Sequence, residues 1–154
     1  MFYLSVKWLH ILSSTVLFGT GLGTAFFMWM SNRSKSLPAI VFATRTVVLA
    51  DGIFTTPAIV IQPITGFILA KLAGFPLTTP WLLAAIGLYL FAGACWLPVV
   101  GIQLKMRSLA QIAQQTDQPL SAEYWSLTRS WLILGVLAFP AVVVIFWLMV
   151  ATPA

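Results

Sequence analysis

The chain has 154 residues, of which 60% are hydrophobic and 7% are charged, whereas ordinary soluble domains carry about 25% charged residues. This length allows one domain, residues 1–154, and excludes a separate soluble domain. The formal net charge of +5 does not indicate nucleic-acid binding, because the basic residues lie scattered at the edges of long apolar stretches. We therefore predict an integral protein of the cell membrane.

Four apolar stretches are long enough to cross a bilayer, which takes about 20 residues. They cover roughly residues 2–30, 41–73, 81–104 and 130–152. These stretches predict an all-α fold, a four-transmembrane-helix bundle that contacts the lipid bilayer along its length. The first stretch is apolar from Phe2 onward and has no basic leading segment, so we interpret it as an uncleaved span.

The first stretch contains His10, the only histidine of the chain. His10 lies about nine residues into the helix, roughly 14 Å from its end at about 1.5 Å per residue. Ionisable side chains are costly in a membrane and usually have a function there. A neutral imidazole can bind iron through one ring nitrogen and donate a hydrogen bond from the other. Because a lone histidine has no spacing motif, simple packing against a neighbouring helix stays open.

The second stretch carries Asp51 near its start, six residues beyond Arg45. This carboxyl group either pairs with Arg45 or a loop lysine at the interface, or takes part in proton relay. If it is deeply buried, desolvation disfavours the carboxylate.

The same stretch contains two interior prolines, Pro57 and Pro63. Each removes a backbone hydrogen bond, so we expect a kink at one of them. The hydroxyl groups of Thr55 and Thr56 can satisfy backbone groups that such a kink frees. A helix break beside Asp51 is also a feature that a small transporter component would use.

Three further polar or sulfur-bearing residues match His10 in depth. Counted from the nearest helix ends, Gln62 of the second stretch and Tyr89 of the third lie about as deep as His10. The sequence therefore predicts a polar layer of His10, Gln62 and Tyr89. Met149 is the methionine of the fourth stretch nearest in depth to His10.

Basic residues near the span ends predict the orientation. Six lie in or near the first and third connections, and two lie on the opposite side. The six are Arg33, Lys35, Arg45, Lys105, Arg107 and Arg129; the two are Lys7 and Lys71. The positive-inside rule places the six in the cytoplasm and both termini outside.

Three short segments resemble the small four-helix membrane protoporphyrinogen oxidase family. They are residues 6–11 (VKWLHI), the Thr55, Thr56, Pro57 run with Gly66 after it, and residues 81–82 (WL). The chain as a whole resembles more closely a family of predicted integral membrane proteins of unknown function. It is also similar, more distantly, to copper-resistance D-type membrane domains. The resemblance covers the first three spans, and the fourth in hydropathy alone.

The resemblance implies a b-type haem. His10 falls on the haem-linked histidine of the oxidase family, and Thr55, Thr56 and Pro57 fall on its TTP element. A second axial ligand would be Met149, water, or His10 of a second copy in a homodimer.

One position departs from the oxidase pattern. That pattern has a lysine a few residues after the tryptophan that opens the third span, and here Ala84 or Ala85 stands in its place. The resemblance therefore favours haem binding, with electron transfer or redox sensing, over porphyrinogen oxidation. Two alternatives stay open: a cofactor-free structural or accessory subunit of a membrane complex, and a small transporter component that uses Asp51 and the break at Pro57 and Pro63.

Overall fold

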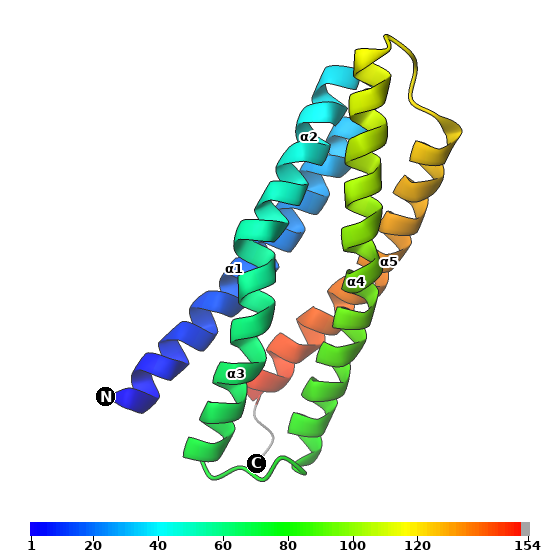
Figure 1. Ribbon diagram of the computed structural model, residues 1–154. Helices are drawn as coiled ribbons and strands as arrows, with labels where there is room; N and C mark the ends of the chain where they lie inside the picture. The colour runs from blue at the N-terminus through cyan, green and yellow to red at the C-terminus, as the bar shows by residue number, and fades with distance from the viewer. Residues whose placement is uncertain (152–154) are drawn as a thin grey trace.

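The computed structural model describes residues 1–151. It contains helices α1 (Phe2–Ser34), α2 (Leu37–Ala50), α3 (Thr56–Leu72), α4 (Pro80–Gln115) and α5 (Ala122–Ala151), with a π-helical turn η1 (Asp51–Thr55) between α2 and α3. These residues form no strand. Because α2, η1 and α3 follow one another without a gap, the chain has four candidate membrane spans. They run antiparallel side by side in Figure 1, which confirms the predicted all-α four-helix bundle.

The helices are longer than the apolar stretches because polar residues extend them. The first span continues through polar residues to Ser34, and α4 continues to Gln115, beyond the predicted apolar stretch that ends at 104. The last helix begins at Ala122, eight residues before the predicted span. Residue 152, the predicted end of that span, lies outside the described residues. At about 1.5 Å per residue, α4 is roughly 54 Å long, well above the roughly 30 Å of hydrocarbon in a bilayer.

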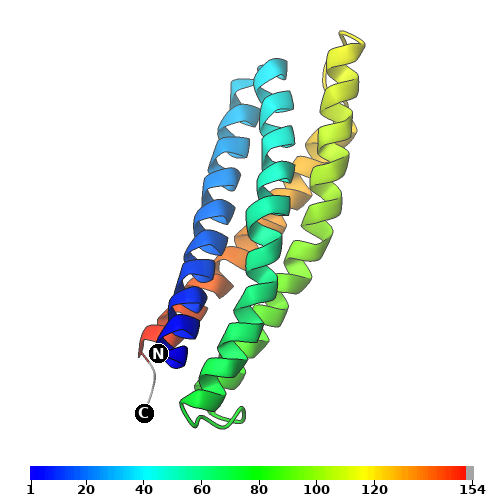
Figure 2. The same ribbon diagram turned by 60° about the vertical axis from the view of Figure 1, so that its left-hand side comes forward.

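The start of α1 and the end of α5 lie at the same end of the bundle, together with the connection between α3 and α4 (Figures 1 and 2). The opposite end carries the α1–α2 turn and the connection between α4 and α5. Lys35 ends α1 in a left-handed conformation with φ 54°, and Pro38 follows in the first turn of α2, where a missing N–H costs little. This arrangement groups the six basic residues named above toward one end of the molecule.

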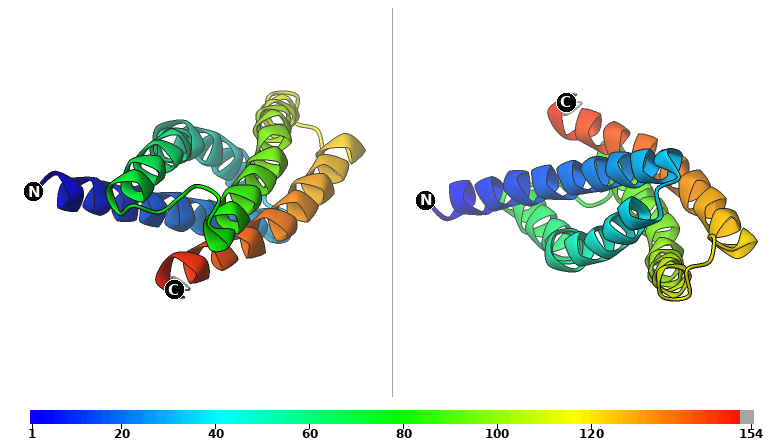
Figure 3. Two further views of the ribbon diagram at one scale, coloured as in Figure 1. Left: turned by 90° about the horizontal axis from the view of Figure 1, so that it is seen from below. Right: turned by 90° about the horizontal axis from the view of Figure 1, so that it is seen from above.

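The best-packed part of the bundle lies toward the end with the α1–α2 turn. Its buried residues come from α1, α2, α4 and α5: Met28, Ile40, Ala43, Val47, Val99, Met106, Ala110, Tyr124 and Trp131. The buried Tyr124 hydroxyl donates a 2.6 Å hydrogen bond to Oδ1 of Asn32 and so joins α5 to α1. The N-terminal half of α1 points away from α4 and α5 (Figure 3). Its polar contacts are therefore made mainly with α3.

Candidate functional site

The His10 ring faces α3. Its Nδ1 lies 2.7 Å from the hydroxyl oxygen of Thr65. That hydroxyl also lies 2.7 Å from the Ile61 carbonyl of its own helix, the bond that a helical threonine commonly makes. A hydroxyl has one proton to donate. When Thr65 donates to Ile61, Nδ1 of His10 carries the proton and donates to Thr65.

The opposite ring nitrogen is then unprotonated. Within residues 1–151, Nε2 of His10 has no hydrogen-bond partner. Its lone pair is available to a metal, and the ring is held by the bond at Nδ1. A histidine oriented in this way by its other nitrogen is the usual arrangement at metal sites.

Gln62 joins the same two helices one turn farther along. Its Nε2 donates to the His10 carbonyl at 2.7 Å and to the Ser13 hydroxyl at 2.6 Å. The Ser13 hydroxyl in turn donates to the His10 carbonyl at 3.1 Å. These bonds fix the backbone of α1 around His10 against α3.

Gly66 leaves room for the imidazole. A Cβ added at this glycine would come within 3.3 Å of Cε1 of His10, which is tighter than ordinary van der Waals contact. Thr65 and Gly66 together therefore set the position of the ring, one through a hydrogen bond and the other through the absence of a side chain. Gly66 was predicted only as part of a family motif, and the roles of Thr65 and Ser13 were not predicted.

Tyr89 lies apart from this group. Its hydroxyl donates to the Ile59 carbonyl at 2.5 Å. Ile59 is four residues before Pro63, which has no N–H to offer to that carbonyl. Tyr89 thus supplies the donor that Pro63 lacks. Of the three residues predicted to form a polar layer, His10 and Gln62 lie together. Tyr89 instead bonds to α3 at the Ile59 carbonyl.

The irregular turn η1 forms around Asp51. The backbone N–H of Thr56 bonds to the Asp51 carbonyl five residues earlier, and the Thr56 hydroxyl donates to the same oxygen at 2.9 Å. The Thr55 hydroxyl donates to Oδ1 of Asp51 at 2.7 Å. The break in the second span thus comes just before Pro57, while Pro63 lies inside α3. Turns of this kind occur frequently at functional sites.

Asp51 also lines a cavity of about 490 Å³ between the helices. The wall includes Thr55, Tyr89 and two residues that sequence reasoning did not place in a site, Cys95 and Gln103. His10 does not line it. Asp51 makes no ion pair with Arg45, and the ion pair found in residues 1–151 joins Lys105 of α4 to Glu123 of α5.

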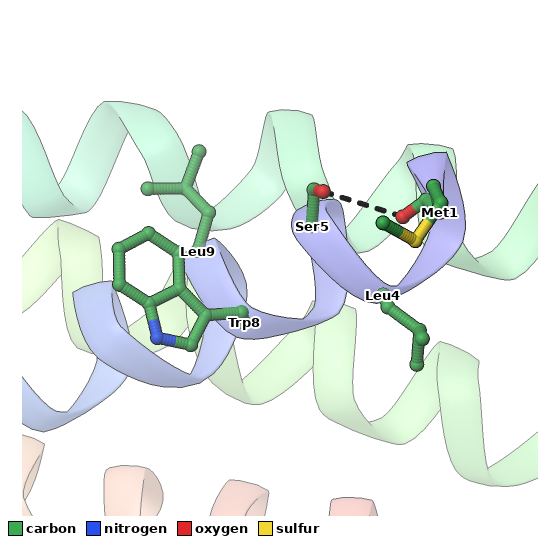
Figure 4. A pocket seen from close by; sticks show the side chains of 5 residues that line it. All are labelled: Met1, Leu4, Ser5, Trp8 and Leu9. Carbon is green, nitrogen blue, oxygen red and sulfur yellow. Dashed lines mark hydrogen bonds between the residues drawn. The ribbon is translucent and has the colours of Figure 1, made fainter.

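A second hollow lies on the first turns of α1 (Figure 4). Its polar side chain, Ser5, donates to the Met1 carbonyl of the same helix at 3.2 Å. The other lining residues are Met1, Leu4, Trp8 and Leu9. Because this wall comes from one helix and its hydroxyl is already bonded, it offers no group for chemistry.

Metal ligands are scarce. Across residues 1–151, no three His, Cys, Asp or Glu side chains gather where they could hold an ion. Met149, the predicted partner ligand, lies in the last turns of α5, at the end of the bundle where α1 begins (Figure 1). An iron at His10 would therefore depend on a macrocycle for most of its ligands.

Residues 4–153 match the sequence profile of a family described as predicted integral membrane protein (DUF2269). No curated protein and no solved structure matches the chain. The match covers nearly the whole sequence and agrees with the four apolar helices of the bundle. The chain therefore belongs to the DUF2269 family of predicted integral membrane proteins.

Proposed function

We propose that this integral membrane protein binds b-type haem through Nε2 of His10 and serves in electron transfer or redox sensing. One observation carries the proposal: the Nδ1 bond to Thr65 at 2.7 Å orients the ring and leaves Nε2 without a hydrogen bond among residues 1–151. Partners of this kind typically fix the tautomer of a ligating histidine and make it more basic.

The surrounding residues fit such a role. Gly66 leaves the ring unobstructed on its α3 side, and Gln62 holds the α1 backbone at His10. Bound haem supplies one-electron chemistry, with a potential set by its axial ligands and their hydrogen bonds. The candidates for the second axial ligand are Met149, water, or His10 of a second copy in a homodimer.

The resemblance of residues 6–11 and 55–57 to the membrane protoporphyrinogen oxidases adds support for haem. We do not propose porphyrinogen oxidation, because an alanine, Ala84 or Ala85, stands where that family has its lysine. The more distant likeness to copper-resistance D-type domains adds no ligand set, since the chain has one histidine and one cysteine.

The test is a visible absorption spectrum of tag-free protein, produced in haem-replete cells and purified from membranes, oxidised and reduced. We expect a Soret band that is lost in His10→Ala. Thr15→Val is the matched control, because the Thr15 hydroxyl bonds only the Ile11 carbonyl of its own helix; its spectrum should equal that of the wild type. A wild-type protein without a Soret band would favour the cofactor-free accessory subunit. An unchanged band in His10→Ala would show that His10 is not the ligand.

A further inference from the structure

The cavity between the helices has the size and lining of a small-molecule site. Its volume of about 490 Å³ lies within the range of roughly 300–1,000 Å³ that is typical of ligand pockets. Residues of α1, η1, α3, α4 and α5 form the wall, which is mostly apolar. Its aromatic members are Phe18, Tyr89, Trp96, Trp131 and Phe139.

Two polar side chains from different elements are buried in this wall. Asp51 of η1 is 8% exposed and Gln103 of α4 is 4% exposed. Oδ1 of Asp51 accepts a hydrogen bond from Thr55, and its second oxygen has no donor within residues 1–151. The amide of Gln103 makes no hydrogen bond to that part of the chain either. Buried polar groups normally have partners, so both groups have bonding capacity left for a ligand.

Among the described residues, the cavity wall carries an acidic side chain but no basic one. Asp51 is the one acidic residue in it, and no lysine, arginine or histidine of the described chain lines the cavity. An ionised carboxylate in apolar surroundings is costly unless a cation accompanies it. A ligand with a positive charge supplies that missing partner, whereas an anionic ligand would add a second negative charge.

We propose that this cavity binds a small organic cation, an ammonium group carried on an aromatic or aliphatic body. The ammonium donates to the Asp51 carboxylate and to the amide oxygen of Gln103. The body packs against the apolar wall, and aromatic faces such as those of Trp96 and Trp131 add cation–π attraction. This site is separate from His10 and does not depend on haem.

The experiment compares three probes that share one body and differ in the head group. Protein in lipid nanodiscs is titrated with 1-naphthylmethylamine, 1-naphthylmethanol and 1-naphthoate by calorimetry, and empty nanodiscs give the reference for partitioning into lipid. We expect the amine to bind at least about tenfold more tightly than the alcohol, the difference that one charge-assisted hydrogen bond supports. Equal affinities, or tighter binding of the naphthoate, would overturn the proposal.

Variants locate the site. Asp51→Asn should weaken amine binding by at least about tenfold and remove the preference over the alcohol. Asp117→Asn is the matched control, because Asp117 is an exposed residue of the α4–α5 connection and its loss should leave the affinity unchanged. His10→Ala should also leave it unchanged, which keeps this test distinct from the haem test. Unaltered amine binding in a folded Asp51→Asn variant would contradict the proposal.

A variant that fills the cavity covers the case in which Asp51→Asn does not fold. Gly93 lines the cavity, and a Cβ added there meets no atom within 4 Å. Gly93→Leu should therefore fold, occupy part of the volume and abolish amine binding. Full binding by Gly93→Leu would show that the amine binds elsewhere.

Discussion

Two residues of α3 hold the His10 ring in the position from which we propose that it binds haem. Thr65 takes the Nδ1 hydrogen bond and Gly66 sets how close the ring approaches the helix. A ring that is fixed at one nitrogen loses little further freedom when its other nitrogen binds iron. The positioning residues should therefore affect haem affinity without being ligands.

Replacing Thr65 tests this positioning. Thr65→Val keeps the shape of the side chain but removes the acceptor for Nδ1, and changes of this kind typically lower affinity about 10- to 100-fold. Thr65→Ser retains the hydroxyl and should stay near the wild type. Haem titration of the apoprotein, followed at the Soret band, measures both. Equal affinities of the valine and serine variants would show that the Thr65 bond does not orient the ligand.

Gly66→Ala tests the space beside the ring. The new Cβ would lie 3.3 Å from Cε1 of His10, so the ring must shift, and we expect weaker haem binding with an altered reduced-minus-oxidised spectrum. Gly87→Ala is the control, because a Cβ at Gly87 meets nothing within 4 Å. Identical spectra for the two alanine variants would argue against a close contact between Gly66 and His10.

The second span accommodates its two prolines, Pro57 and Pro63, in two different ways. Before Pro57 the backbone widens into the η1 turn, and the hydroxyls of Thr55 and Thr56 bond to Asp51. At Pro63 the helix stays regular, and Tyr89 of α4 donates to the carbonyl that the proline leaves unpaired. Both arrangements give hydrogen-bond donors to backbone or carboxyl oxygens, which lipid could not supply.

A double-mutant cycle measures the energetic coupling between Tyr89 and Pro63. Tyr89→Phe should destabilise the protein by about 1–3 kcal/mol, because it leaves the Ile59 carbonyl without a donor. In a Pro63→Ala background the new N–H serves that carbonyl, so the same change should cost less. Thermal unfolding in detergent, followed by circular dichroism, gives the four stabilities. Additive effects would show that Tyr89 and Pro63 are not coupled.

The sequence predicted the elements better than their orientation. Hydropathy gave four spans, and the two prolines indicated a break whose position the η1 turn now defines. The inward orientation of Gln103 and Thr65 could not be predicted, because apolar residues cover both the lipid-facing and the inward faces of membrane helices. Hydrophobic periodicity then does not indicate which face turns inward. Depth, which follows from helix rise, placed Gln62 and Tyr89 level with His10. Gln62 bonds to the His10 carbonyl, whereas Tyr89 bonds to Ile59.

Charge and packing differ between the two ends of the helix bundle. The end with the α1–α2 turn carries six of the eight basic residues and the buried cluster around Tyr124. The end at which α5 finishes carries Lys7 and Lys71 and the start of α1, which α3 alone accompanies closely. A cytoplasmic, well-packed end and a looser outer end are what this distribution predicts.

Reporter insertions test the orientation. Enzymes active only in the cytoplasm should work when inserted at residues 35–36 or 116–121, and enzymes active only outside should work in the 73–79 connection. Replacing Arg33, Lys35 and Arg107 with glutamine should weaken this preference, because basic residues near the span ends determine it. Outside activity from an insertion at 116–121 would reverse the assignment.

The most direct measurement uses the fact that the chain has a single histidine. Tag-free protein is labelled with ¹⁵N-histidine, loaded with haem and examined in the ferric state by electron–nuclear double resonance. We expect a strong ¹⁵N coupling from Nε2 of His10 at the iron, which disappears in protein with unlabelled histidine. Bound haem without that coupling, or protein that takes up no haem, would contradict the assignment of His10 as the axial ligand.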